Sequence, residues 1–341
     1  MRSKTLGLFL ALAVLMTAGA LYADDAEQIH FQGKMYSELS TDIDDEGARE
    51  TNFSVTRVYM TMKKKLGNGW SVRFTTDIGT EDGEPYDVYA KYAYIQKKMD
   101  LGVVSLKAQY GLIGTPNIGK TDKMMDLRWI YNDYSLDKAK EFLGGHSLDN
   151  SADMGASVSA KIMKKVEVIG AVTNGEGYKD TKPNYDGKAY YGTLQINPFA
   201  DLYVNGYYRT EKSAASRTES YFGGGLGWKA KNMMIGGNYI MAKDENGSVE
   251  DEYTTMEFWA HLKMQEFIGM PLIIAARYGA GSADKEAAGA DSDTSVIGVG
   301  VGYQFTKSFR AIAWFENAEY DPEVGDSTKE QVFYLKSEAK F

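Results

Sequence analysis

Residues 70–78 read WSVRFTTDI and alternate two kinds of side chain along their whole length. Trp70, Val72, Phe74, Thr76 and Ile78 share one parity, and Ser71, Arg73, Thr75 and Asp77 share the other. Successive side chains of an extended strand point to opposite faces of a sheet. The stretch is therefore predicted to be a β-strand with one apolar and one polar face.

The same alternation recurs along the chain in segments rich in Tyr, Val, Phe and Thr, which is the pattern of half-buried strands. It is clear at 103–112, 153–163 and 202–209. A soluble β-sandwich also alternates in this way, so the pattern alone leaves a sandwich and a membrane barrel open.

The connections between the strands separate these two architectures. Short links such as 67–69, 164–165 and 231–232 alternate with long links such as 112–152 and 280–293. Short turns at one rim and long loops at the other are typical of a transmembrane antiparallel up-and-down β-barrel. The fold is therefore predicted to be all-β with about sixteen strands, although the long connection at 263–270 leaves fourteen or eighteen open. The expected strands are 29–42, 52–65, 70–78, 86–98, 103–111, 153–163, 166–174, 188–197, 201–209, 219–230, 233–242, 253–264, 271–279, 294–305, 309–318 and 330–341.

The N-terminus has the features of an export signal. Arg2 and Lys4 precede an uncharged apolar run from Leu6 to Ala20, and small residues follow it. This is the pattern of a secretory signal peptide, and the run is short for a membrane anchor. We expect cleavage after Ala23, or alternatively after Ala20, so that 1–23 is removed and 24–341 forms a single barrel.

The composition excludes several classes of protein. The 341 residues include no cysteine, so there is neither a disulfide nor a thiolate metal site. The formal net charge of −9 argues against a nucleic-acid-binding protein, which needs a concentrated basic face. His30, His146 and His261 lie far apart and lack metal-ligand spacing. We therefore expect no cofactor, no metal and no enzymatic activity.

The last predicted strand ends at the terminal residue Phe341. With the strand pattern, this ending resembles Gram-negative outer-membrane porins, whose final strand commonly ends in phenylalanine. The resemblance implies that the chain lies in the outer membrane among lipid and lipopolysaccharide, that the barrel assembly machinery recognises Phe341, and that the protein is a homotrimer. The stretch 109–178 also looks like the matching region of the phosphate-selective porin O/P family, although the motifs there are weak.

Five cations share the polar face of the first five predicted strands, each near the middle of its strand. Because neighbouring strands lie about 4.8 Å apart, they are expected to form one basic patch on the wall of a water-filled pore. In a soluble sandwich they would instead be ordinary solvated residues. The five are Lys34, Arg57, Arg73, Lys91 and Lys107.

The link 112–152 is far longer than an ordinary connection and is expected to be functional or disordered. The porin resemblance implies that it folds into the barrel and narrows it; the alternative is a surface flap. Carboxylates of this loop facing the basic patch would create a transverse field across the pore. The candidate loop residues are Lys120, Asp122, Asp126, Arg128 and Asp133, of which Arg128 is the first choice for an inward position.

Tyrosines are expected to form the aromatic girdles at the two membrane interfaces. Candidates are Tyr59, Tyr92, Tyr94, Tyr110, Tyr190, Tyr208, Tyr239, Tyr278, Tyr303 and Tyr334. The apolar faces of 153–163 and 166–174 contain no tyrosine and are the best candidates for a trimer contact.

The predicted function is an outer-membrane channel for passive diffusion of small hydrophilic solutes and ions, with a mild preference for anions. A structural or adhesive barrel whose lumen is plugged by the loop is the alternative.

Overall fold

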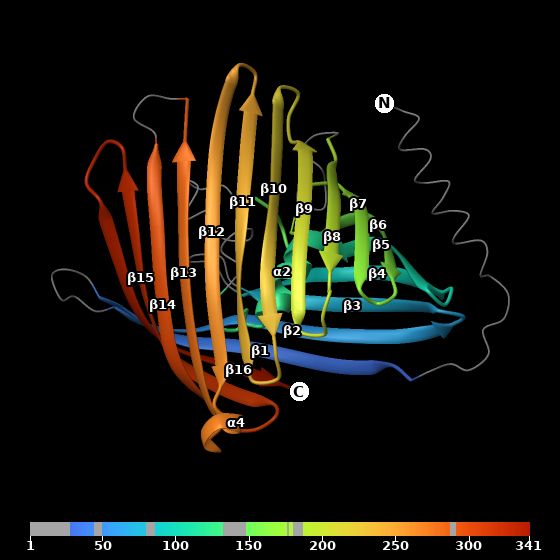
Figure 1. Ribbon diagram of the computed structural model, residues 1–341, viewed down its shortest axis with the longest axis horizontal. Coiled ribbons are helices and arrows are strands. Elements are labelled where there is room, and N and C mark those ends of the chain that lie inside the picture. Colours follow the sequence, from blue (N-terminus) through green and yellow to red (C-terminus); the bar gives the residue numbers. More distant parts are fainter. Residues whose placement is uncertain are drawn as a thin grey trace.

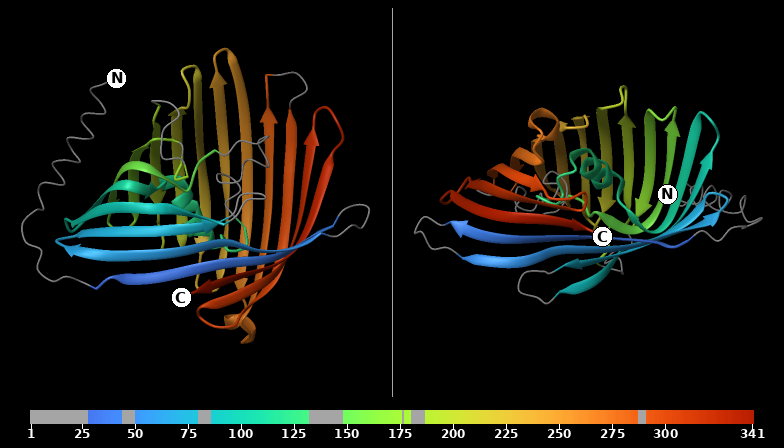
Figure 2. Two further views of the ribbon diagram at one scale, coloured as in Figure 1. Left: turned by 180° about the vertical axis from the view of Figure 1, so that it is seen from behind. Right: turned by 90° about the horizontal axis from the view of Figure 1, so that it is seen from below.

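Sixteen antiparallel strands form a closed barrel in the computed structural model, which describes residues 28–43, 50–79, 86–131, 148–175, 177–179, 187–286 and 291–341. Each strand pairs with its neighbours in chain order, and β1 pairs with β16 to close the ring (Figures 1 and 2). The strands are β1 (His30–Ile43), β2 (Thr51–Gly67), β3 (Trp70–Gly79), β4 (Asp87–Asp100), β5 (Val104–Gly114), β6 (Ala152–Ile162), β7 (Val166–Thr173), β8 (Ala189–Ile196), β9 (Leu202–Lys212), β10 (Arg217–Lys229), β11 (Met233–Asn246), β12 (Val249–Lys263), β13 (Leu272–Asp284), β14 (Ser292–Gln304), β15 (Phe309–Pro322) and β16 (Thr328–Lys340).

The predicted strand count and order are confirmed. The long connection at 263–270, which left the count open, contains the short helix α4 (Gln265–Ile268) and no further strand. The proposed signal peptide, 1–23, lies outside the described residues. No helix in the described part of the chain is both long enough and apolar enough to cross a membrane.

Tight turns at one rim use backbone conformations that favour glycine. In the turn between β2 and β3, Gly67, Asn68 and Gly69 have φ values of 84°, 49° and 77°. A Cβ atom on Gly69 would also overlap the carbonyl oxygen of Lys98 on β4. Glycine and asparagine tolerate this left-handed region better than other residues, so this link can be short.

The alternation of β3 has the predicted orientation. Phe74 is 41% exposed on the outer face, whereas Thr75 and Asp77 are buried on the inner face. The outer faces of the other strands carry exposed aliphatic and aromatic residues in the same way, for example Ile297, Val299 and Val301 on β14. This apolar outer surface is the one that would face lipid.

A β-bulge in β4 changes the face on which part of the expected aromatic girdle lies. The register between β3 and β4 shifts between Thr75 and Thr76, so both Lys91 and Tyr92 of β4 line the lumen. A bulge inserts one extra residue and changes the face on which the following side chains lie. Tyr92 and Tyr94 consequently line the inside of the barrel, and so does Tyr59 of β2, which has the same parity as Arg57. The predicted place of these three tyrosines in the girdle is therefore wrong. Tyr110, Tyr190, Tyr208, Tyr239, Tyr278 and Tyr303 are at least 39% exposed.

The connection between β5 and β6 includes the helix α2 (Pro116–Met125), which lies inside the ring of strands in the right-hand view of Figure 2. Thr115 precedes the helix, and Pro116 occupies a first-turn position that needs no hydrogen-bond donor. The helix contacts β7, β8, β9, β10 and β11. Its Met124 side chain lies against Gly227 of β10, where an added Cβ would come within 2.6 Å of the methionine sulfur.

Apolar residues of this connection join a cluster on the inner wall. Ile118, Met124, Leu127, Trp129 and Ile130 are each at most 3% exposed. They pack with inward-facing residues of the far wall, namely Tyr207, Tyr221, Ile240, Tyr253, Trp259, Ile273, Val296, Ile312 and Trp314. One side of the barrel interior is therefore filled by side chains.

The inner face of β14 gives a test of this packing. Gly298 lies under the fully buried Trp314 ring, which stacks on Tyr131 with 5.7 Å between ring centroids. We expect Gly298→Val to destabilise the barrel by about 1–3 kcal/mol, because its side chain would overlap the indole. Thermal unfolding in detergent measures the effect. Gly206→Val on the outer face of β9 is the matched control, since no atom of the described residues lies within 4 Å of a Cβ there. Equal losses from both variants would contradict the prediction.

Candidate functional site

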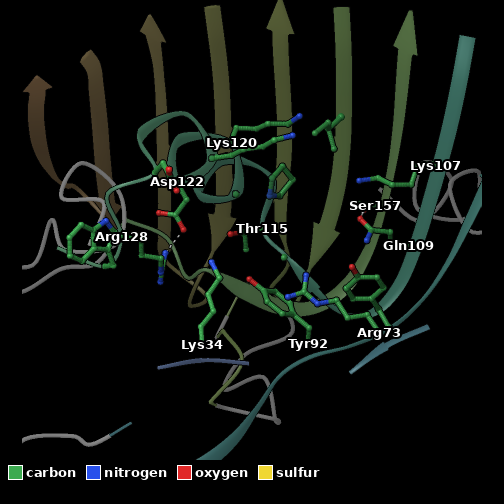
Figure 3. A pocket seen from close by; sticks show the side chains of 18 of the residues that line it. Lys34, Arg73, Tyr92, Lys107, Gln109, Thr115, Lys120, Asp122, Arg128 and Ser157 are labelled. Carbon is green, nitrogen blue, oxygen red and sulfur yellow. Dashed lines mark hydrogen bonds and ion pairs between the residues drawn. The ribbon is translucent and has the colours of Figure 1, made fainter. Parts of the chain in front are cut away.

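Two adjoining cavities lie between α2 and the wall formed by the early strands. Their volumes are about 550 and 470 Å³. Both are lined by Lys34, Tyr36, Arg73, Tyr92, Asp122 and Arg128, so they meet at these residues. Figure 3 shows the first cavity, with Asp122 and Arg128 from the loop and Lys34, Arg73 and Tyr92 from the wall.

Three of the five predicted wall cations, Lys34, Arg73 and Lys107, line the first cavity. Lys34 is near Glu338 of β16, with 3.8 Å between Nζ and the carboxylate oxygen. Arg73 donates from Nε to Thr75 Oγ1 at 3.0 Å, and its guanidinium lies 4.2 Å from the centre of the Tyr92 ring. Lys107 lines the first cavity. Among the residues that the structure describes, neither Arg73 nor Lys107 has a carboxylate at ion-pair distance.

The other two wall cations are paired with Asp77 of β3. The buried Asp77 carboxylate lies 3.1 Å from Lys91 Nζ and 3.4 Å from Arg57 Nη1, and it accepts a hydrogen bond from the Tyr178 hydroxyl at 2.8 Å. The Lys91 ammonium also lies over the rings of Tyr59 and Tyr178. Lys91 is only 3% exposed. The two tyrosine rings cover its ammonium and Asp77 compensates its charge, which the sequence did not indicate.

The charges of α2 are also largely paired. Lys120 Nζ lies 2.6 Å from Glu167 of β7. Burial lowers the pKa of the Lys120 ammonium below its ordinary value, against the opposing effect of Glu167. Lys123 and Lys161 are close enough to lower it further. This end of the cavity therefore has more positive than negative charge.

Asp122 of α2 forms an ion pair with Arg128, which follows the helix in the same loop. Asp126 has a left-handed φ of 52° and donates its backbone N–H to Asp122 O as the helix ends. Asp126 and Arg128 both line the first cavity. Arg128, which the sequence placed inward, has its charge compensated locally by Asp122, while Asp133 lies outside the described residues.

A chain of neutral polar groups crosses the wall beside Lys107. Gln96 donates to Ser71 at 3.4 Å, Gln109 donates to Gln96 at 3.3 Å, and Ser157 donates to Gln109 at 3.3 Å. The chain runs from β6 to β3 and keeps the amides in one orientation. It provides uncharged donors and acceptors that can replace water around a passing solute.

Basic residues outnumber acidic residues in both cavities. Of the described residues, eight Lys or Arg and three Asp or Glu line the first cavity, and six and one line the second. The three acidic residues of the first cavity are Asp122, Asp126 and Glu338. Low-dielectric walls concentrate the field of such a patch and raise the local concentration of oppositely charged solutes. Within the described ranges, no group of three His, Asp or Glu side chains could hold a metal ion.

The sequence matches the family model described as Gram-negative porin over residues 10–322. The chain belongs to the Gram-negative porin family. A search of curated protein sequences gives no match.

Solved structures share the barrel of this porin at low sequence identity. The anion-selective porin from Comamonas acidovorans has a TM-score of 0.67 and 11% identity, covering 92% of this chain and 99% of that one. The outer-membrane channel DcaP of Acinetobacter baumannii has a TM-score of 0.65 and 12% identity, covering 94% and 100%. OmpT, an outer-membrane protein of Vibrio cholerae, in its trimer form, has a TM-score of 0.63 and 14% identity, covering 93% and 100%. The match to the porin family model and the barrel shared with these outer-membrane proteins identify this porin as an outer-membrane channel.

Phe341 continues the seam between β16 and β1. Phe341 exchanges two backbone hydrogen bonds with Gly33 of β1, at 2.6 and 3.1 Å. Its ring lies on the outer face over Gly33, where a Cβ would overlap it. Phe31, Met60, Met62 and Phe74 line an apolar groove beside the ring.

A buried polar network on the opposite wall was missed by sequence reasoning. Asp149, at the end of the β5–β6 connection, contacts Tyr191, Arg209 and Tyr221 of β8, β9 and β10. Alternation places these three side chains on the inner face of their strands. Nothing in the sequence pairs them with a loop residue about 40 to 70 positions away.

Proposed function

We propose that this porin passes small hydrophilic solutes and ions by passive diffusion and mildly prefers anions. The observation that carries the preference is the pair Arg73 and Lys107, which line the cavity without a carboxylate at ion-pair distance among the described residues. The fold of the anion-selective Comamonas porin is consistent with it.

We further propose that α2 and residues 126–131 form the constriction, and that solutes pass on the side of β1–β6. Support comes from the apolar cluster around Leu127, Trp129 and Trp314, which fills the side of β9–β15. The cavities lined by Lys34, Arg73 and Lys107 lie on the other side of the helix.

The polarity of the constriction differs from the transverse field expected from the sequence. In that expectation, loop carboxylates would face a basic wall, but Asp122 is paired with Arg128 and Lys120 with Glu167. We propose that both sides of the passage present positive charge, from Arg73 and Lys107 on the wall and from Lys123 on the helix. Such a passage selects by charge sign more than by dipole orientation.

The partners proposed for this porin are those of an outer-membrane barrel: lipid and lipopolysaccharide around it, and the barrel assembly machinery through Phe341. A homotrimer is proposed because one structural neighbour, OmpT, is described in a trimer form. The tyrosine-free outer faces of β6 and β7 remain the proposed contact, with Ala156 and Val158 packed against Ala108 there.

Conductance of the purified protein in planar lipid bilayers tests the channel itself. We expect discrete steps whose current is proportional to voltage, because an open aqueous passage has no binding step to saturate. Liposomes containing the protein should swell in solutions of small neutral sugars. A structural barrel with a plugged lumen would give neither steps nor swelling, and that result would end the channel proposal.

A further inference from the structure

Both ends of the β5–β6 connection are tied to the same tyrosine on the barrel wall. Asn117, in the first turn of α2, donates from Nδ2 to the Tyr221 hydroxyl at 2.8 Å. The Tyr221 hydroxyl in turn donates to the Asp149 carboxylate at 2.6 Å. At the base of the connection, Thr115 donates to the carbonyl oxygen of Asn150 at 2.5 Å.

The contacts extend along the wall in both directions. Thr193 of β8 donates to Asn117 Oδ1 at 2.6 Å. The Tyr191 hydroxyl donates to Asp149 at 2.9 Å and accepts from Arg209 Nε at 3.3 Å. All members are buried: Asn117 and Tyr221 are at most 1% exposed, and Thr193, Asp149, Tyr191 and Arg209 at most 7%. We call Thr193, Asn117, Tyr221, Asp149, Tyr191 and Arg209 the loop anchor.

The Asp149 side chain has no exposed surface, so its charge is withdrawn from water. Among the described residues, the charged and titratable groups that face it include Tyr191 from β8, Arg209 and Glu211 from β9, and Tyr221 from β10. Arg209 lies 3.9 Å from the carboxylate and also forms an ion pair with Glu211, so its charge is shared. Burial raises the pKa of the Asp149 carboxyl from its ordinary value of 3.8 to about 6, against the opposing effects of Arg209 and the two hydroxyls.

We propose that Asp149 is the positioning residue that holds α2 against β8–β10, and that protonation of its carboxylate tightens this hold. The inference rests on the proposed channel, whose width the position of α2 would set. Because α2 is packed on the wall of β7–β11, a helix that leaves the wall can only move toward the cavity lined by Arg73 and Lys107. Loosening of the anchor would therefore reduce the conductance.

The hydrogen bonds of the loop anchor can be satisfied in both protonation states. With Asp149 ionised, Thr193 donates to Asn117, Asn117 donates to Tyr221, and Tyr221 donates to Asp149. A protonated Asp149 can donate to the Tyr221 hydroxyl, which then donates to the Asn117 amide oxygen. Turning the amide by 180° lets its nitrogen donate to Thr193. Hydroxyls and amides permit this reversal because each both donates and accepts.

The direction of the pH effect follows from linkage. A carboxyl whose pKa is higher in the anchored loop than in a released loop binds its proton more tightly when anchored. Acid therefore favours the anchored state, and a rise in pH through the range from about 4 to 6 favours release. The ratio of released to anchored loops rises about tenfold per pH unit in this range and levels off above pH 6.5.

Single-channel recordings at two pH values test the proposal in the wild-type porin. The ratio of time in a reduced-conductance state to time in the full state should be about tenfold higher at pH 7.5 than at pH 5. Asp149→Asn mimics the protonated carboxyl, so it should show the low ratio at both pH values. Tyr221→Phe removes both links through the hydroxyl and should show a high ratio at both.

Asp201→Asn is the matched control, because Asp201 is an exposed carboxylate in the turn before β9. It should keep the wild-type dependence on pH. A wild-type ratio that is the same at both pH values would overturn the proposal, as would an Asp149→Asn variant with an unchanged pH dependence. Absence of any conductance steps in the wild type would instead overturn the channel, so the two failures are distinguishable.

Discussion

Replacing Arg73 and Lys107 together by glutamate is expected to convert the anion preference of this porin into a cation preference. The two substitutions change the charge beside the passage by four units, and neither cation has an ion-pair partner among the described residues that would offset the change. At about 7 Å and water-like screening each unit contributes about 0.6 kcal/mol, or about 2 kcal/mol in total. The permeability ratio of anions to cations should fall by at least tenfold.

The reversal potential in asymmetric KCl measures this change, and it should reverse its sign. The recording is best made at about 0.1 M salt, where charges act over about 10 Å. Lys165→Glu with Lys307→Glu is the matched control, because it makes the same change in net charge at two exposed turn residues. If Arg73→Glu with Lys107→Glu left the reversal potential unchanged, the basic wall would not set the selectivity.

Removal of Phe341 is expected to lower the amount of assembled barrel in the outer membrane severalfold. The deletion removes both backbone hydrogen bonds between Phe341 and Gly33, which continue the β1–β16 seam. It also exposes Gly33 and the apolar groove beside Phe31 and Phe74. Two hydrogen bonds contribute about 1–3 kcal/mol, and the barrel assembly machinery is proposed to recognise the same residue.

Heat-modifiable mobility on gels distinguishes the folded barrel from the unfolded chain and gives the assembled fraction. Phe199→Ala is the control, since Phe199 is 72% exposed in the turn between β8 and β9 and lies away from the seam. Wild-type levels of assembled protein after deletion of Phe341 would show that the terminal residue contributes neither to closure nor to assembly.

The strands of this porin were predictable because the alternation of apolar and polar residues within each strand shows which face meets lipid and which meets the lumen. Alternation in 70–78 separates Phe74 on the lipid side from Asp77 in the lumen, and no distant contact is needed for that assignment. The turn Gly67-Asn68-Gly69 could be placed for the same reason, since its backbone conformations favour the residues present. The parity of Arg73 and Lys107 followed directly from the strand pattern.

Side chains near irregularities were harder to predict. The bulge in β4 places Lys91 and Tyr92 side by side in the lumen, and no residue type marks it in the sequence. Lys91 was expected to be an open pore cation, but Asp77 pairs with it and Tyr178 covers it. Tyr178 belongs to another connection about 90 residues later in the chain, so its contact depends on tertiary packing that strand periodicity does not encode.

The loop charges could be identified as a set, but not assigned to partners. Arg128 was expected to face inward and lines the first cavity, whereas its pairing with Asp122 depends on the chain reversal after α2. Asp149 was one of several loop carboxylates in the sequence, and only the closed barrel brings it to Tyr221.

The reversal potential of the wild-type porin under a KCl gradient tests most directly whether the passage beside Arg73 and Lys107 carries the current. With a higher salt concentration on one side, we predict a potential whose sign shows that chloride crosses more readily than potassium. A potential of zero, or one of the opposite sign, would contradict a conducting path along the basic wall.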